Sequence, residues 1–369
     1  MSEIAGEPLK QTPLNAIHRA LGAKMVDFGG WDMPVHYSGI IDEHNTVRNA
    51  VGIFDVSHMG EIEIRGPEAL ALIDFLTPNA ASKLKDGQAQ YSALLYEHGG
   101  FVDDILVHKV SAHHYFLCVN ASNQDKDYAH IREHNTFQAE VEFASARYAL
   151  LAVQGPHAPS VVRKLADVDL TPVRYYHFVD GSVGGVPARI ARTGYTGELG
   201  FELYVAAEEA VRVWNAVLDA GAEFGIKPAG LGARNTLRLE AAMALYGHEI
   251  TASLTPLEAG LERIVKFEKG NFLGRKALLE QHERGVHRLL TGFEMTGRGI
   301  GRDGYEIMIG GAPAGWVTSG GPSPTLGRNI GMCYLPVAHT RPGENIQVMI
   351  RNQPVEAVTR PMPFYKRAN

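Results

Sequence analysis

Segments with a strand-like pattern and segments with a helical pattern follow one another over the first two thirds of the sequence. Residues 61–65 and 186–192 alternate charged or polar with apolar side chains, as half-buried strands do. Residues 207–220 place apolar side chains on one stripe at helical spacing, and residues 231–243 also have a helical pattern. Helices and strands therefore intermix along this part of the chain.

One combination of elements occurs twice. A strand at 61–65 leads into a Gly-Pro pair at 66–67 and then a helix, and a strand at 148–153 leads into a Gly-Pro pair at 155–156 and a helix. Proline is well tolerated in the first turn of a helix. The recurrence after about ninety residues predicts an internal duplication of α+β type.

The pattern changes near residue 285, where a polar linker gives way to short strands and turns. Turns are predicted at Gly310-Gly311 and from Pro322 to Pro324, because glycine and proline end regular elements. This pattern predicts a separate all-β, barrel-like domain over residues 285–369. Three of its strands are expected at 305–309, 346–350 and 355–359.

Composition indicates an ordinary soluble protein. The 369 residues are too many for one simple core, and 45% apolar with 21% charged residues is typical of globular domains. A formal net charge of −6 gives no electrostatic reason to expect nucleic acid or an anionic membrane as partner. We therefore expect neither.

Neither the cysteines nor the N-terminus indicates secretion. Cys118 and Cys333 lie far apart in apolar segments, so we expect two buried thiols, no disulfide and no metal site. The first ten residues resemble neither a signal peptide nor a transit peptide, and no apolar run is long enough to span a bilayer. These features predict a cytoplasmic location.

The segment YSALLYEHGGFVDDILV, which begins at Tyr91, is the most informative part of the chain. Two apolar runs flank a Gly99-Gly100 pair, which predicts a strand, a tight turn and a second strand carrying Asp103 and Asp104. Successive strand side chains point to opposite faces, so only one of the two carboxylates can face a given cavity. On the residues alone, capping of the glycine turn is the main alternative for both.

Two further polar residues interrupt apolar strands. Asn120 ends the predicted strand at 115–120, where it either lines a pocket or helps reverse the chain. Glu202 lies between Phe201 and Leu203, and an acid in such an apolar strand needs a partner or a ligand.

Other charged or nucleophilic residues have simpler interpretations. Arg234 and Arg238 are four residues apart on one helical face, where the expectation is solvated or salt-bridged surface charge. Asp55, Ser57 and His58 are the residue types of a hydrolase triad, but such near neighbours in sequence cannot orient on one another. His58 is therefore expected to line a site or brace a loop.

Taken together, these segments closely resemble the T-protein family of the glycine cleavage system, aminomethyltransferases that use tetrahydrofolate. The resemblance covers nearly the whole chain. It rests on six motifs in order: KMVDFGGWDMP from Lys24, VGIFDVSHMGE from Val51, YSALLYEHGGFVDDILV from Tyr91, RTGYTGELGFEL from Arg192, AGLGARNTLRLEAAMALYG from Ala229, and SPTLGRNIG from Ser323.

The resemblance implies a multi-domain folate-binding fold, with three domains around a central channel. It assigns residues 1–280 to the folate-binding region, built as two interleaved α+β subdomains, and residues 285–369 to the barrel-like domain. The implied reaction moves a methylene carbon from the S-aminomethyl-dihydrolipoyl arm of the H-protein to tetrahydrofolate. Ammonia leaves and 5,10-methylenetetrahydrofolate forms, with no metal involved.

The resemblance also assigns roles to residues. Asp104 matches the catalytic carboxylate, which would stabilise positive charge on the transferred carbon and hold folate N10 for attack. Asp103 is left as its turn or scaffold partner. Glu202 matches the carboxylate that binds the donor edge of the pterin. The remaining folate-binding positions are Tyr195, Asn120 and Arg234, with Tyr91 and Tyr365 as weaker matches.

Two alternatives within the same architecture stay open. One is a folate-dependent demethylase of methylated sulfur compounds. The other is a non-enzymatic folate-binding protein that supports iron–sulfur cluster assembly; that class carries a KGCYxGQE-like motif, whereas this chain has KGNFLGRKA from Lys269 and lacks the cysteine.

Overall fold

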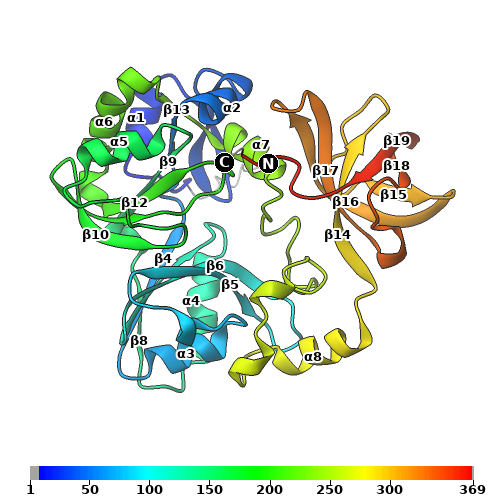
Figure 1. The fold of residues 1–369 in the computed structure, drawn as a ribbon, viewed down its shortest axis with the longest axis horizontal. Coiled ribbons are helices and arrows are strands. Elements are labelled where there is room, and N and C mark those ends of the chain that lie inside the picture. Colours follow the sequence, from blue (N-terminus) through cyan, green and yellow to red (C-terminus); the bar gives the residue numbers. More distant parts are fainter. Residues whose placement is uncertain (1–7, 368–369) are drawn as a thin grey trace, which may run out of the picture.

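The computed structural model describes residues 8–367, which form two mixed α/β lobes and a β-barrel (Figure 1). The first lobe is built on a six-stranded sheet with the order β10-β11-β12-β9-β3-β13, in which only β13 runs parallel to its neighbour. Its strands are β3 (Gly52–Asp55), β9 (Tyr148–Gln154), β10 (Phe178–Val183), β11 (Val186–Ala191), β12 (Gly200–Ala206) and β13 (Lys227–Pro228).

Both faces of this sheet are buried. Leu151 and Val153 of β9 pack with Trp214 in the core beneath the helices, whereas Leu150 and Ala152 belong to a second core on the opposite face. Burial on both faces explains why β9 is a continuous apolar run without alternation. The covering helices are α1 (Asn15–Ala20), α5 (Ala158–Leu165) and α6 (Ala210–Gly221).

The second lobe is a five-stranded antiparallel sheet with the order β5-β6-β7-β4-β8. All of its strands fall between β3 and β9 in sequence, so the two lobes are interleaved. Its strands are β4 (Gly60–Arg65), β5 (Gln88–Leu95), β6 (Phe101–Ser111), β7 (His114–Val119) and β8 (Glu140–Phe143), and its helices are α3 (Ala69–Leu76) and α4 (Gln124–Glu133).

The expected repeat is present as a structural unit. β4 leads through Gly66 into α3, and β9 leads through Gly155 into α5. The two glycines have φ angles of 130° and 132°, which non-glycine residues rarely adopt. In both, an added Cβ would lie 2.6 Å from a carbonyl oxygen, that of Gln138 or of Ala50. The same backbone constraint therefore accounts for glycine at the two positions.

The C-terminal lobe is a closed six-stranded barrel, which confirms the α+β class and the predicted barrel-like domain. Phe293, Val317 and Val348 fill its interior. Its strands are β14 (Arg288–Met295), β15 (Glu306–Ile309), β16 (Ala312–Ser323), β17 (Arg328–Pro336), β18 (Asn345–Ile350) and β19 (Gln353–Arg360).

One predicted turn of the barrel is wrong in part. Pro322 lies within β16 and pairs with Asn329, so the turn begins only after Ser323. The pairing of β15 with β16 ends at Trp316, which leaves the other edge of β16 free around Pro322. A proline on such an edge costs no ladder hydrogen bond.

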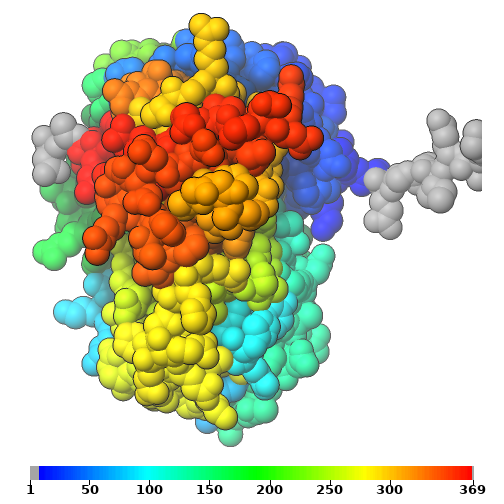
Figure 2. Space-filling model, turned by 90° about the vertical axis from the view of Figure 1, so that its right-hand side faces the viewer, coloured from blue at the N-terminus to red at the C-terminus, as the bar shows by residue number. Residues whose placement is uncertain are grey.

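The remaining elements connect the lobes. They are the hairpin of β1 (Lys24–Phe28) and β2 (Trp31–His36), and the helices α2 (Ile40–Asn49), α7 (Leu231–Glu240) and α8 (Arg275–Arg284). α7 lies between the first lobe and the barrel (Figure 1). Seen from the barrel side, the barrel covers the upper half of the face and the segment around α8 covers the lower half (Figure 2). No helix within residues 8–367 is long and apolar enough to cross a membrane.

Candidate active site

The facing surfaces of the two sheets form a shared core that carries the candidate residues. On β12, Phe201 and Leu203 face the helices of the first lobe, so Glu202 and Tyr204 point to the opposite face. On that face Tyr204 packs with Phe116 of β7, at 5.0 Å between ring centroids. The polar residues of β12 therefore point toward the second sheet.

The same alternation on β6 separates the two aspartates. Ile105 and Val107 face the helices of the second lobe, and Asp103 shares their parity, whereas Asp104 shares the parity of Leu106, which packs in the core between the sheets. The expectation that only one carboxylate faces a given space is therefore confirmed, and Asp104 is the one that points toward the first sheet.

Asp103 is fully buried and acts as a scaffold residue. Its Oδ2 accepts a hydrogen bond from the backbone N–H of Asn120 at 2.9 Å, and its Oδ1 accepts one from the Asn123 side-chain amide at 2.6 Å. The glycine turn is instead closed by the Tyr96 N–H, which donates to the Gly100 carbonyl at 2.9 Å. Capping of the glycine turn is thus the wrong interpretation, because Asp103 holds the turn that follows β7.

Asp104 is held by two neutral donors. The Tyr91 hydroxyl donates to Oδ2 at 2.9 Å, and the Asn120 amide donates to Oδ1 at 2.7 Å. Burial, followed by the negative charge of Asp103, raises the pKa of Asp104 to about 7, although the two hydrogen bonds act in the opposite direction. A carboxyl group with a pKa near neutrality is suited to taking up or giving back a proton at working pH.

Asn120 connects the two aspartates. Its side-chain amide lies 2.9 Å from Oδ1 of Asp103 and 2.7 Å from Oδ1 of Asp104, while its backbone N–H bonds Asp103. The residue therefore both reverses the chain after β7 and presents a donor to Asp104. The two interpretations left open by the sequence are compatible.

A second group of predicted residues lies around Arg234. Its guanidinium carbon is 4.6 Å from the centroid of the Tyr195 ring, a cation–π distance. Glu202 is 7% exposed and accepts a hydrogen bond from the Thr193 hydroxyl. Burial raises the pKa of Glu202, and the Thr193 hydrogen bond and the charge of Arg234 oppose that rise.

The two groups border on each other. Burial raises the pKa of Tyr195 above its ordinary value, and the charge of the Asp104 carboxylate adds to that rise. Tyr195 in turn adds to the raised pKa of Tyr91. We call the six residues the polar cluster: Tyr91, Asp104, Asn120, Tyr195, Glu202 and Arg234. Six of the seven residues predicted from the sequence thus lie together.

The surface interpretation of α7 is wrong. Arg238 is 2% exposed, and its guanidinium bonds Glu249 and Ser319, each at 2.9 Å. Arg234 is half-buried under the ring of Tyr195. Spacing along a helix shows which side chains share a face but not what covers that face, and here Tyr195 of the first lobe and Ser319 of the barrel help to cover it.

The partners of Asp55 exclude a hydrolase triad made of Asp55, Ser57 and His58. His18 Nε2 lies 2.8 Å from Oδ2 of Asp55, and the Thr12 hydroxyl donates to the same oxygen at 2.6 Å. His58 is instead buried, with the Phe28 ring edge-on at 5.6 Å between centroids. Burial, followed by the charge of Arg234, lowers the pKa of His58 to about 4, so the ring is neutral at working pH.

Glu61 is a buried acid of the core between the sheets that the sequence pattern does not identify. The alternation at 61–65 predicts that Glu61 lies on the polar face of a half-buried strand, but β4 lies between β7 and β8 and Glu61 is 1% exposed. Burial raises its pKa well above the ordinary value, and its charge acts on Cys118 and Tyr204 of the core between the sheets. Only knowledge of the strand order could have identified it.

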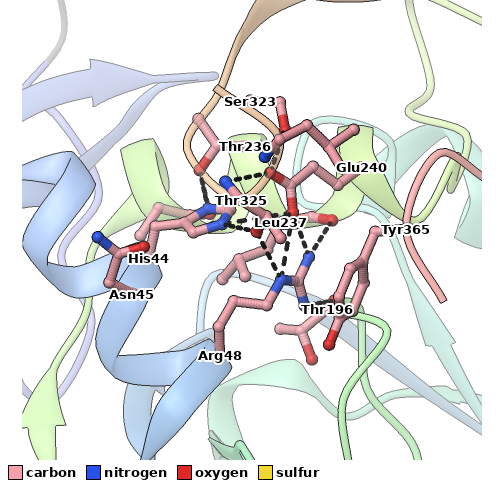
Figure 3. A network of polar contacts seen from close by, with 12 residues as sticks. His44, Asn45, Arg48, Thr196, Thr236, Leu237, Glu240, Ser323, Thr325 and Tyr365 are labelled. Carbon is pink, nitrogen blue, oxygen red and sulfur yellow. Dashed lines mark hydrogen bonds and ion pairs between the residues drawn. The ribbon is translucent and has the colours of Figure 1, made fainter. Parts of the chain in front are cut away.

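Tyr365 makes its polar and ring contacts with a different group of residues. Its ring stacks at 3.9 Å from the guanidinium carbon of Arg48 (Figure 3). Its hydroxyl donates to Glu198 at 2.7 Å. The Tyr365 N–H donates to the Glu240 carbonyl at 2.8 Å. The structure therefore uses Tyr365 to fasten the C-terminal segment to α7.

Arg48 is the centre of this second assembly. Its Nη2 lies 2.8 Å from Glu240 and its Nη1 lies 2.9 Å from Glu198, and all three side chains are almost fully buried. From the barrel, Thr325 donates to Glu240 through its N–H at 3.0 Å and its hydroxyl at 2.7 Å (Figure 3). We call Arg48, Glu198, Glu240, Thr325 and Tyr365 the interdomain clasp, because it joins α2, α7, the barrel and the C-terminal segment.

Thiols and metal ligands are not gathered into a site within residues 8–367. Cys118 and Cys333 are buried and unpaired, as expected, and no group of three or more His, Cys, Asp or Glu side chains in that range could hold a metal ion.

The chain was compared with known proteins. Residues 14–269 match the family described as GCVT N-terminal domain, and residues 288–366 match the glycine cleavage T-protein C-terminal barrel domain. An aminomethyltransferase from Acidobacterium capsulatum is 52% identical over 373 residues, with 100% of this chain and 99% of the relative covered. An aminomethyltransferase from Moorella thermoacetica is 51% identical over 97% of this chain and 98% of the relative.

A solved structure supports the same assignment. The glycine cleavage system aminomethyltransferase T from Bartonella henselae superposes with a TM-score of 0.91 at 33% identity, covering 97% of this chain and 98% of that one. These matches extend over the whole length and do not favour the demethylase or the non-enzymatic alternative. The chain therefore belongs to the glycine cleavage T-protein family and is an aminomethyltransferase.

Proposed function

We propose that the polar cluster is where the methylene carbon is transferred, with tetrahydrofolate as acceptor and the aminomethylated lipoyl arm of the H-protein as donor. The observation that carries this proposal is Asp104: a half-buried carboxyl group with two neutral donors, no ion pair among the described residues and a pKa of about 7. Such a group is suited to a site where positive charge and protons move.

The reaction defines what the site must do. Carbon–nitrogen bonds to folate N5 and N10 form, the bonds of the carbon to sulfur and to ammonia break, and the two N–H protons end on the thiol and the ammonia. Ionised Asp104 stabilises the positive charge that develops on the transferred carbon. It also accepts a hydrogen bond from N10–H, which holds that nitrogen for attack.

Glu202 binds the pterin in this proposal. The pterin edge presents paired N–H donors, and a carboxylate is the matching acceptor. Glu202 lies on the same inter-sheet surface as Asp104. Within residues 8–367 the hydroxyl of Thr193 is the one side-chain donor to its carboxylate, which leaves acceptor capacity. The ring of Tyr195, backed by Arg234, offers a flat surface for the folate.

Asn120 and Tyr91 serve as folate-site residues mainly through the two hydrogen bonds that fix Asp104. Direct contact of Tyr365 with folate stays a prediction, and its position in the interdomain clasp favours an indirect role. We also propose that the chain divides into a folate-binding region over residues 1–280 and a barrel-like domain over residues 285–369. A cytoplasmic location and the lack of a metal requirement stay predictions that rest on sequence and resemblance.

The test is formation of 5,10-methylenetetrahydrofolate from tetrahydrofolate and aminomethylated H-protein. We expect product with the loaded H-protein and none when the H-protein lacks lipoate. A methylated thioether serves as the matched alternative donor. Turnover of the thioether without any use of H-protein would overturn the proposal and favour a demethylase.

A further inference from the structure

Asp127 in the first turn of α4 is a buried acid to which no group donates a hydrogen bond. The residue is 0% exposed, and neither carboxyl oxygen has a hydrogen-bond donor within the part of the chain that the structure describes. A buried ionised carboxylate in this position would carry a large desolvation cost with nothing to offset it. The position is therefore tolerable only if Asp127 holds a proton.

The groups around Asp127 support that protonation state. Asp103 faces it from β6, Asp104 acts on it more weakly from the opposite face of that strand, and Lys126 neighbours it on α4. The Lys126 ammonium bonds the Val102 carbonyl at 2.6 Å and the Tyr246 hydroxyl at 3.0 Å, so its hydrogen bonds go elsewhere. Burial, followed by the charge of Asp103, raises the pKa of Asp127 to about 11.

Asp103 is the member of this group that carries the negative charge. It accepts three N–H donors: the Asn120 backbone at 2.9 Å, the Asn120 amide at 2.9 Å and the Asn123 amide at 2.6 Å. Hydrogen bonds to the ionised form stabilise that form. Two ionised carboxylates only accept hydrogen bonds, so Asp127 can bond Asp103 only as a neutral acid that donates its O–H.

The first turn of α4 brings the parts together. The Asp127 N–H donates to the Asn123 carbonyl at 2.8 Å, so the two residues lie one turn apart on the same side of α4. Asn123 and Asp127 therefore approach Asp103 from one helix. Asp103 in turn holds Asn120, whose amide donates to Asp104.

We propose that Asp127 is a positioning residue for Asp104: as a neutral acid it donates to Asp103, which fixes the Asn120 amide against Asp104. This rests on the proposed function only in that Asp104 is taken as the working carboxylate. The chain Asp127–Asp103–Asn120–Asp104 thus spreads the charge of Asp103 and keeps one donor aimed at Asp104.

Removing the Asp127 O–H donor should change the pKa of Asp104 in a definite direction. Without the Asp127 O–H, the charge of Asp103 acts more strongly on Asp104 and the Asn120 amide is less well held. Both changes disfavour the ionised form of Asp104, so its pKa rises and the acid limb of the pH–rate profile moves to higher pH.

Two variants separate this role from simple packing. Asp127→Ala is expected to lose about tenfold in kcat, the size of one hydrogen bond to a charged group, with KM for tetrahydrofolate changed less than about threefold. Its acid limb should move up by about one pH unit. Asp127→Asn supplies a neutral N–H donor of the same shape and should restore most of the lost rate and the original limb. Asp125→Ala, an 83% exposed side chain on the same helix, is the matched control.

Infrared spectroscopy tests the proton itself without any turnover. At pH 8 the wild-type protein should show the C=O stretch of a protonated carboxyl group that is lost in Asp127→Asn and kept in Asp125→Ala. Because this readout does not involve folate or H-protein, it fails or succeeds independently of the proposed function. The proposal would be overturned if Asp127→Asn kept this C=O band. It would also be overturned if Asp127→Asn were as impaired in turnover as Asp127→Ala.

Discussion

Replacing Arg48 by methionine removes the cation of the interdomain clasp and leaves two buried carboxylates without it. The Arg48 side chain is 5% exposed, and those of Glu240 and Glu198 are 0% and 1% exposed. Removing one partner of a buried ion pair costs about 3–5 kcal/mol, because the remaining charge stays buried. For a cooperative unit of this size each kcal/mol lowers Tm by about 2–4 °C, so the expected decrease is about 6–20 °C.

Calorimetry at neutral pH measures the change, and Lys227→Met is the matched control. Lys227 pairs with Asp42 of α2 at 2.9 Å, but both side chains are 46% exposed. Exposed pairs contribute about 0–1 kcal/mol, so the control should lose at most about 4 °C. An Arg48→Met protein as stable as the control would refute the idea that the clasp holds the lobes together.

The pH dependence of the same variant has a definite sign. Burial alone would raise the pKa of Glu240, but hydrogen bonds from His44 and Ser323, with the neighbouring Arg48, bring it down to about 2. The folded pKa lies below the ordinary value of 4.5, so this stabilisation is present above about pH 4.5 and is lost as pH falls toward 2. The difference between wild type and Arg48→Met should therefore shrink below about pH 4.

Three further predictions concern the site and the repeat. Tyr91→Phe removes a donor that favours ionised Asp104, so the acid limb of kcat should move up by about one to two pH units; an unchanged limb would contradict the assignment. Glu202→Ala should weaken tetrahydrofolate binding by about tenfold or more in calorimetry, and an equal dissociation constant would argue against a pterin contact. Gly155→Ala should lower the free energy of unfolding by about 1–3 kcal/mol or more in urea titration, because its φ is 132° and its Cβ would meet the Ala50 carbonyl.

Side-chain alternation was the strongest sequence signal. It predicts that Asp103 and Asp104 face opposite sides of their strand, and the structure places them on opposite faces of β6. The same rule explains Glu202, whose neighbours in β12 face the helices of the first lobe. Period-two geometry is a local property, so the sequence carries it reliably.

The pattern of hydrophobic and polar residues does not indicate which side chains pair when they are far apart in the sequence. Nothing in the sequence near Arg238 indicates its partner Ser319, which lies in the barrel. Nothing near Arg48 indicates its partner Glu240. Both arginines are buried because of these partners. Asp127 likewise looks like one of several acids on a polar helix, and only the packing of α4 against β6 brings it to Asp103. Burial of charged residues depends on which elements cover them, which strand and helix periods do not specify.

Asp104→Asn tests the role of the carboxylate most directly, since the change is isosteric and removes only the charge and a proton site. The measurement is the single-turnover rate of 5,10-methylenetetrahydrofolate formation with aminomethylated H-protein, alongside the dissociation constant of tetrahydrofolate. We predict a dissociation constant within about threefold of wild type and a rate lower by about 10² or more, the contribution of a positioned acid–base group. A rate within about threefold of wild type would contradict the central role of Asp104.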